Sequence, residues 1–166
     1  MGADATQRKL PDAREVATLR TWLRLLACTN LIEKRIRTQL RSRFATTLPR
    51  FDVLAQLDAA DRESGIGLTL SQLSHRLMVT NGNLTGLTER LVQEGLVSRE
   101  DSPTDGRTQY VKLTPAGRRA FNAMLPDHRK WVSRMFASFQ DQDLSELHEL
   151  LGKLKNSVSA TSEEEK

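Results

Sequence analysis

The chain of 166 residues contains one cysteine, Cys28, and this scarcity excludes an intramolecular disulfide and any metal site built from several cysteines. Because disulfides persist mainly in oxidising compartments, a reducing one is the simplest expectation. Long apolar runs are also absent: residues 1–16 lack the apolar core of a signal peptide, and no later segment is long enough to span a bilayer. We therefore expect a cytoplasmic protein with no membrane partner.

The sequence also lacks the short motifs that identify common catalytic sites. It has no Gly-x-Ser-x-Gly turn, no glycine-rich phosphate loop and no His-Glu-x-x-His pair of zinc ligands. Its histidines, His75, His128 and His148, stand far apart without metal-ligand spacing, and we interpret them as surface or packing residues. These absences predict a protein that is not an enzyme and that needs no metal or cofactor.

What the sequence does contain is an excess of basic charge. It carries 25 Lys and Arg against 21 Asp and Glu, which gives a net charge of +4 and a pI near 9.6. This balance is compatible with a polyanionic partner and equally with ordinary solubilising charge, until the basic residues are found to cluster. The length fits one domain, or one domain with appended helices.

Helical patterns occupy both ends of the chain. After a flexible leader at residues 1–11, residues 12–47 place apolar side chains at steps of three and four, as one very long helix or two abutting ones. A second helical region, residues 115–160, kinks or restarts at Pro126 and precedes a disordered tail at residues 161–166. We expect the two regions to form a homodimer interface, because the first helix has few neighbours in its own sequence; packing on a monomeric core is the alternative.

The middle of the chain, residues 48–114, has a different order of elements. A leucine-striped helix is followed by a second helix, residues 80–95, and then by strand-forming segments 96–100 and 108–114 around a turn-rich loop. We therefore predict a mainly α fold with a small β-hairpin wing, a winged helix-turn-helix lobe plus a helical dimerisation region. The second helix of such a lobe can lie in the DNA major groove, although winged domains also dock onto proteins.

That second helix is built from residues that form helices poorly. Leucines at helical spacing give it an inward face, yet its first turns contain Asn81, Gly82, Asn83 and Gly86. Each glycine costs about 1 kcal/mol relative to alanine in a helix interior. A face without side chains permits DNA to approach the backbone closely, and asparagine can read adenine. We predict that this helix contacts DNA through Thr80, Asn81, Gly82, Asn83, Thr85 and Gly86.

A set of short motifs runs through residues 70–118. It comprises a Ser or Thr helix cap, an "L..RL...GLV.R" run, a wing with Asp-x-Arg, and a final "LT..G". The residues that supply them are Thr80, Leu87, Arg90, Leu91, Gly95, Leu96, Val97, Arg99, Asp105, Arg107, Leu113, Thr114 and Gly117. In these motifs the segment resembles the core of the MarR family of bacterial transcription regulators. The resemblance implies an obligate homodimer whose recognition helices enter successive major grooves.

The resemblance also implies a role for the wing. In this family an arginine of the wing enters a flanking minor groove. The matching residue here is Arg107, and Asp105 can hold its guanidinium in place. The alternative is that the two residues form a solvated pair in a turn.

The sequence departs from the family's pattern in the recognition helix. Basic or proline residues are common in the family at the positions of Asn81, Gly82 and Gly86, so contacts made there by arginine cannot be carried over. More of the phosphate binding would then come from basic residues around the helix. Those residues are Arg90, Arg99 and Arg107.

Control by a small ligand is a further implication of the resemblance. The ligand would be an aromatic acid or its coenzyme A thioester, bound in a hydrophobic cleft between the DNA-binding lobe and the dimer helices, although any one candidate aromatic can simply belong to the core. The candidate effector residues are Trp22, Arg24, Arg43, Phe51, His128 and Trp131. We predict a repressor that binds a pseudo-palindromic operator as a dimer and leaves it when the ligand binds.

Redox sensing by Cys28 is the alternative means of control. Some regulators of this family respond to peroxide through a cysteine, and a sensor cysteine has to be exposed. Because Cys28 lies in a helical segment beside Leu26 and Ala27, we expect a buried structural cysteine instead.

Overall fold

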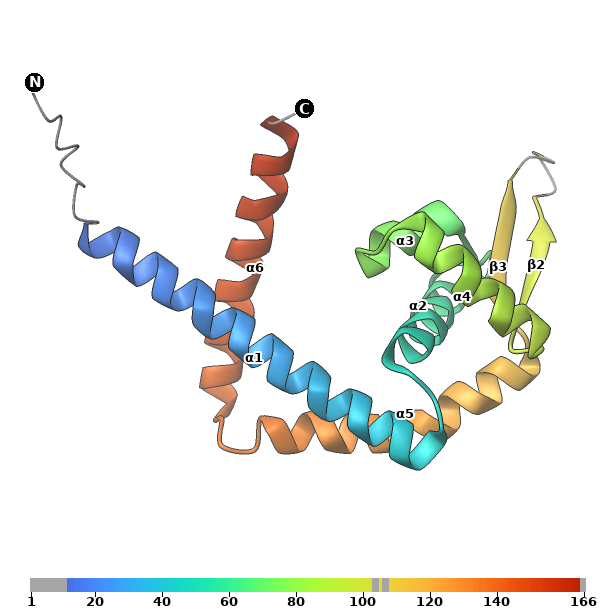
Figure 1. Ribbon diagram of the computed structural model, residues 1–166, viewed down its shortest axis with the longest axis horizontal. Coiled ribbons are helices and arrows are strands. Elements are labelled where there is room, and N and C mark those ends of the chain that lie inside the picture. The colour runs from blue at the N-terminus through green and yellow to red at the C-terminus, as the bar shows by residue number, and fades with distance from the viewer. Residues whose placement is uncertain (1–11, 103–104, 106–107, 165–166) are drawn as a thin grey trace, which may run out of the picture. The chain divides into compact units, whose positions relative to one another are not determined.

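Two units make up the computed structural model, which describes residues 12–102, 105 and 108–164 (Figure 1). The boundary between the units falls after Pro126, inside helix α5. Within the described ranges, no helix is both long and apolar enough to cross a membrane.

Helix α1 spans Ala13–Phe44 as one continuous helix. Asp12 caps its start, because the carboxylate accepts a hydrogen bond of 2.7 Å from the backbone N–H of Glu15. Its buried residues are Ile36 and Leu40, both near its end. Most of the apolar stripe of α1 is therefore left exposed in the single chain. The predicted leader that precedes α1 lies outside the described residues.

Three further helices and a hairpin form the core of the first unit. Helices α2 (Leu48–Glu63), α3 (Leu70–Leu77) and α4 (Asn81–Gln93) precede strands β2 (Val97–Asp101) and β3 (Gln109–Leu113). Figure 1 shows the hairpin standing beside α4. Buried side chains from all five elements include Val53, Leu54, Leu57, Leu73, Leu84, Leu91, Val97 and Val111. The predicted winged helix-turn-helix fold is confirmed.

The sheet contains one more strand than the sequence indicated. β2 and β3 pair antiparallel, with Val97 opposite Leu113. β3 also pairs with a strand of two residues, β1 (Leu68–Thr69), so the strand order is β1-β3-β2. Two residues are too few to show the alternation that predicts a strand. Because β1 ends where α3 begins, this pairing fixes the start of α3 against the wing.

The two helices of the helix-turn-helix start in different ways. α3 has a capping box, in which Gln72 N–H donates to the Thr69 hydroxyl at 3.1 Å and Thr69 N–H donates to Gln72 Oε1 at 2.9 Å. The N-cap residue of α4, Thr80, makes no capping hydrogen bond with its side chain. After α4, Gly95 has a φ of +69°, which favours glycine, and the helix stops. The first backbone N–H groups of α4 therefore receive no hydrogen bond from the side chain of the N-cap residue, unlike those of α3.

Helix α5 (Pro115–Met135) follows β3 directly and touches the lobe at its first turn. A Cβ atom at Gly117 would lie 1.9 Å from the carbonyl oxygen of Leu96, so this contact requires glycine. The Thr114 hydroxyl accepts a hydrogen bond of 3.0 Å from Gly117 N–H and caps the helix. The base of the wing and the start of α5 are therefore in direct contact.

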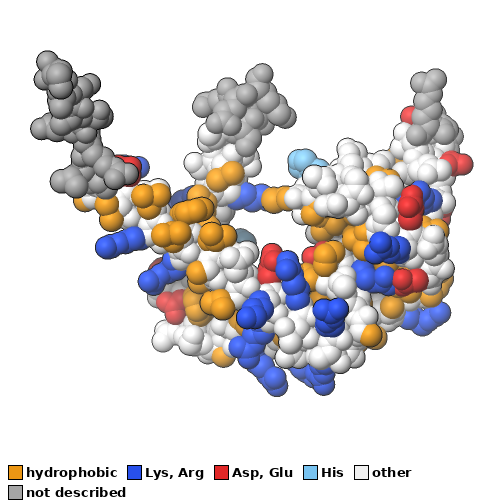
Figure 2. All heavy atoms as spheres, in the orientation of Figure 1, with side chains coloured by type: hydrophobic (Ala, Val, Ile, Leu, Met, Phe, Trp, Pro, Cys, Tyr) orange, Lys and Arg blue, Asp and Glu red, His pale blue; other side chains and the backbone are white. Residues whose placement is uncertain are grey.

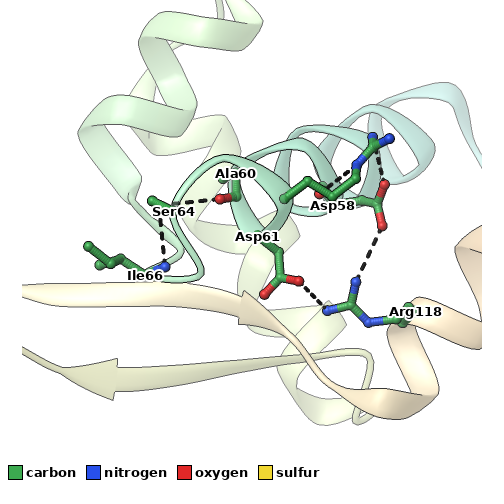
Figure 3. A network of polar contacts seen from close by, with 7 residues as sticks. Asp58, Ala60, Asp61, Ser64, Ile66 and Arg118 are labelled. Atoms are coloured by element: carbon green, nitrogen blue, oxygen red, sulfur yellow. Dashed lines mark hydrogen bonds and ion pairs between the residues drawn. The ribbon is translucent and has the colours of Figure 1, made fainter.

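An ion-pair network holds α5 to α2 (Figure 3). Arg118 donates to Asp61 at 2.7 Å and pairs with Asp58 at 3.5 Å. Asp58 is buried and also pairs with Arg62 on its own helix at 2.8 Å. Because a buried carboxylate without a partner is strongly destabilising, these two guanidiniums are what permits Asp58 in the core.

The second unit consists of the remainder of α5 and helix α6 (Asp141–Glu164). Helix α5 continues through Pro126, where the sequence suggested a kink or a restart. The α6 helix begins after Gln140, whose N–H donates to the Asp143 carboxylate at 2.8 Å. It extends beyond residue 160, where the predicted helical region ended.

Candidate nucleic-acid interface

The first turns of α4 form an exposed polar surface with few side chains. Thr80, Asn81, Gly82 and Asn83 are exposed, while Leu84 behind them is buried. A Cβ atom placed on either glycine of this helix, Gly82 or Gly86, would meet no atom within 4 Å. Within the described part of the chain, no neighbour therefore requires glycine at these positions. Thr85 and Gly86 are half-buried, and the Thr85 hydroxyl donates to Asn81 O at 2.9 Å.

The inner side of α4 carries a polar residue that sequence reasoning missed. Thr88 is fully buried, and its hydroxyl donates to Leu84 O and Thr85 O, each at 2.9 Å. Its position offered a signal, because it lies four residues after one buried leucine and three before another. A polar residue within an apolar stripe needs a partner inside the protein.

Arg99 is that partner. Its Nη2 atom donates to the Thr88 hydroxyl at 3.2 Å, and its buried Nε has no hydrogen-bond partner within the described part of the chain. Arg99 lies on β2, two residues after Val97, and so shares the inward face of that strand. The structure thus directs at least one edge of this guanidinium toward α4, whereas the sequence suggested a phosphate contact.

Backbone and side-chain hydrogen bonds connect the residues that follow β2 to those that precede β3. Thr108 donates to Asp105 from its hydroxyl and from its N–H, each at 2.9 Å, and Ser102 N–H donates to Thr108 O at 2.8 Å. Farther down, Lys112 pairs with Glu100 across the strands at 2.7 Å. Arg107 lies outside the described residues, so its role in the minor groove stays a prediction.

Several arginines of the lobe are engaged in ion pairs. Arg50 pairs with Glu94 at the end of α4, and this hydrogen bond lowers the pKa of Glu94. Arg76 pairs with Glu63 at 2.9 Å. Arg90, in contrast, is exposed on α4 and forms no ion pair with any described residue. It is the arginine of α4 that remains available to a phosphate.

A cleft of about 700 Å³ lies between α1, the start of α2 and α4. The wall from α4 includes Gly82, Gly86 and Arg90, so the cleft reaches the exposed face described above. Leu84 and Leu87 of α4 belong to the same wall. On the other walls are Glu33, Arg37 and Asp52, together with the apolar residues Leu48, Pro49, Leu77 and Val79. Sequence reasoning did not identify these charged residues, because they come together only through the packing of three helices.

The candidate effector residues lie elsewhere. Trp22, Arg24 and Arg43 are exposed on α1, and Phe51 is buried in the core, with its ring centroid 5.5 Å from that of Phe121. The remaining two, His128 and Trp131, belong to the second unit, and burial lowers the pKa of His128. The predicted effector cluster is divided between the two units and stays a prediction.

Exposed apolar side chains gather along α1 (Figure 2). They are Leu19, Trp22, Leu23, Leu26 and Leu31, each between 44% and 68% exposed. In the second unit, α6 exposes Leu144, Leu150, Leu151, Leu154 and Val158. The expectation that Cys28 is buried is wrong: it is exposed, because it follows Leu26 by two residues and so lies on the other side of α1 from that leucine.

The chain is similar to known regulators over most of its length. The sequence pattern of the MarR family matches residues 46–108. An HTH-type transcriptional regulator of Bacillus cereus is 29% identical over 134 residues, covering 80% of this chain and 85% of that protein. The crystal structure of a MarR family regulator from Silicibacter pomeroyi is 29% identical, with a TM-score of 0.71 over 89% of this chain and 99% of that one. A regulator of the same family from Streptomyces coelicolor, solved in complex with DNA, is 23% identical with a TM-score of 0.75, over 90% and 94% of the two chains.

Proposed function

Because the chain belongs to the MarR family of winged helix-turn-helix regulators, we propose that it is a DNA-binding transcriptional regulator that acts as a homodimer. The observation that carries this proposal is the start of α4, where polar side chains and two glycines are exposed while leucines anchor the helix from behind. The N-terminal residues of a recognition helix are those that contact base edges in a major groove. A relative of the same fold that was solved with DNA adds support.

The proposed DNA contacts divide into two kinds. Asn81 and Asn83 read bases, since their amides can donate to and accept from adenine, while Thr80 and Thr85 contact phosphates or thymine methyl groups. Arg90, with the wing arginine outside the described residues, supplies phosphate binding. Because the helix itself carries little positive charge in its first turns, we expect its sequence preference to exceed its contribution to affinity.

A DNA-binding assay with matched variants tests this proposal. Duplexes selected from a random library would be measured by fluorescence anisotropy against a scrambled duplex. Asn83→Ala is expected to lower the preference for the selected duplex, while Asn122→Ala, the same change at an exposed site on α5, leaves it unchanged. If wild type binds both duplexes equally at physiological salt, the assignment of α4 as a recognition helix fails.

The homodimer rests on the apolar side chains that α1 exposes. A contiguous apolar surface of this kind marks an interaction site in soluble proteins, and the residues repeat at helical spacing. Leu23→Glu should therefore produce a monomer in sedimentation velocity experiments. Thr21→Glu, which places the same charge on the opposite side of the helix, is the control and should remain dimeric. The two half-sites of the operator would lie about one helical turn apart.

Regulation by a small ligand is the second part of the proposal. A ligand in the cleft would touch Gly82, Gly86 and Arg90 of the same helix that we place in the DNA groove. It can therefore favour a conformation in which the two recognition helices of the dimer no longer match successive grooves. We propose a repressor that the ligand, an aromatic acid or its coenzyme A thioester, releases from DNA.

One observation favours a second means of control. Cys28 is exposed, as a sensor thiol has to be. If peroxide releases DNA from wild type and fails to do so for Cys28→Ser, redox control replaces the ligand. If both proteins keep their DNA in peroxide, this alternative is excluded.

A further inference from the structure

The cleft beside α4 contains a carboxylate that no cation neutralises by direct contact. Asp52, near the start of α2, is half-buried and forms no ion pair with any described residue. The charge of Arg37 on α1 lowers the pKa of Asp52 in part, but the Arg37 guanidinium pairs with Glu33 at 2.6 Å. Asp52 is therefore an acceptor that has lost much of its water and that receives no side-chain hydrogen bond from the described residues.

The electrostatics of Asp52 agree with this geometry. Burial raises its pKa to about 6, the charge of Glu33 adds to the rise, and Arg37 offsets part of it. At neutral pH the carboxylate is mostly ionised, so a donor placed against it would replace a hydrogen bond that water supplies poorly there. A second negative charge placed there would meet both carboxylates.

The positive charges of the cleft offset the charges of Asp52 and Glu33. Arg90 stands on the α4 wall, so the cleft holds two guanidiniums and two carboxylates, and its net charge is near zero. Leu48, Leu77 and Leu87 are among the apolar residues that make up the rest. The volume of about 700 Å³ suits a small organic molecule.

We propose that this cleft binds an uncharged, largely apolar molecule that donates a hydrogen bond to Asp52 from a hydroxyl or N–H group, and that it rejects ionised carboxylates. An anion placed against Asp52 is repelled by it and by Glu33, while Arg37 is engaged by Glu33 and Arg90 is exposed to water. A cation is attracted by Asp52, but it also meets Arg37 and Arg90 and loses its hydration in a largely apolar site. A neutral donor meets no charge repulsion and loses less hydration free energy than either ion. The inference rests on the proposed function in taking the cleft as the effector site. Within the ligands proposed there, it excludes the ionised free acid. Because coenzyme A itself is a polyanion, a thioester would place only its uncharged acyl group in the cleft.

Isothermal titration calorimetry with four small probes tests the proposal on the full chain. The neutral donor is methyl 4-hydroxybenzoate, and the others are 4-hydroxybenzoate as the anion, tyramine as the cation and methyl 4-methoxybenzoate as the probe without a donor. We expect the neutral donor to bind at least about tenfold more tightly than each of the others, which is the ratio produced by one uncompensated charge or lost hydrogen bond.

Two variants attribute this selectivity to one residue. Asp52→Asn keeps the shape and removes the charge, so the preference for the ester over the free acid should fall to about threefold or less. Glu63→Gln removes a carboxylate at the other end of α2, outside the cleft, and should leave the preference as in wild type. Lowering the pH from 7.5 to about 5.5 should weaken the preference in wild type and leave Asp52→Asn unaffected. Glu33, Arg37 and Arg90 are present in both proteins, so this comparison isolates Asp52.

The proposal is overturned if wild type binds the free acid or tyramine as tightly as the ester. It is also overturned if no probe binds at millimolar concentration, or if Glu63→Gln loses selectivity as Asp52→Asn does. DNA affinity measured without any probe tests the regulator separately. Selective binding to a protein that has no affinity for DNA would remove the proposed function and leave the preference of the cleft intact.

Discussion

Replacing Gly86 by alanine should make the protein more stable and its DNA binding weaker. A Cβ at this position meets no atom of the chain within 4 Å, so the methyl group enters open space. Alanine is favoured over glycine by about 1 kcal/mol in a helix interior. In a protein of this size, that gain corresponds to a rise of roughly 2–4 °C in Tm. The same methyl group would separate α4 from DNA that approaches its backbone, at a cost of about 1–3 kcal/mol, or roughly 5- to 150-fold in affinity.

The two effects have opposite signs, which makes the experiment decisive. Urea unfolding at a fixed protein concentration gives the stability, and fluorescence anisotropy gives the affinity for DNA. Gly152→Ala is the control, because this glycine also lies within a helix, α6, where an added Cβ would meet nothing within 4 Å, and it is remote in sequence from α4. It should gain stability and keep its DNA affinity. If Gly86→Ala gains stability without losing affinity, the glycine face does not approach DNA, and the reasoning is refuted.

Three further predictions concern the lobe. Thr88→Val removes the hydroxyl that accepts from Arg99 and should lower the free energy of unfolding by about 1–3 kcal/mol, seen as a lower urea midpoint with an unchanged m-value. The pKa of Asp52 is raised to about 6, so its contribution to stability is present below pH 4 and is lost as the pH rises through 6. Asp52→Asn should then exceed wild type in stability at pH 7 by about 1–2 kcal/mol, allowing for solvent screening, and the difference should vanish near pH 4 in urea titrations. Arg90→Ala should weaken binding to all duplexes alike and reduce the slope of log affinity against log salt by about one; a loss confined to one sequence would contradict this.

The arrangement of the lobe followed from sequence because its elements carry local signals. Leucines at helical spacing place α3 and α4, and a glycine marks the end of α4 at Gly95. The alternation of side chains along β2 could also have predicted the orientation of Arg99, because Arg99 lies two residues after the buried Val97 and shares its face of the strand. Its charge suggested a phosphate contact, but the shared strand face gives the better account of its bond to Thr88.

The cleft could not be read from the sequence, because no local pattern connects its parts. Glu33 and Asp52 stand on different helices, nineteen residues apart, and Arg90 lies on a third. Each looks like an ordinary surface charge until the helices pack. The expectation for Cys28 was wrong for a local reason: it follows Leu26 by two residues and so lies on the opposite side of α1 from the apolar stripe.

The close approach of Gly117 to Leu96 has a consequence for genetics. Any side chain there would collide with a backbone carbonyl group, which has no rotamer by which to move aside. A selection for colonies that have lost regulation should therefore recover substitutions at this codon repeatedly, although it encodes no proposed contact with DNA or ligand. Given the proposed homodimer, such alleles would be recessive if the altered chains fail to assemble, and dominant if they assemble with wild-type chains into inactive dimers. Whether the alleles are dominant or recessive in a merodiploid strain would therefore show whether the contact between the wing and α5 is needed for folding of the chain or for its regulatory function.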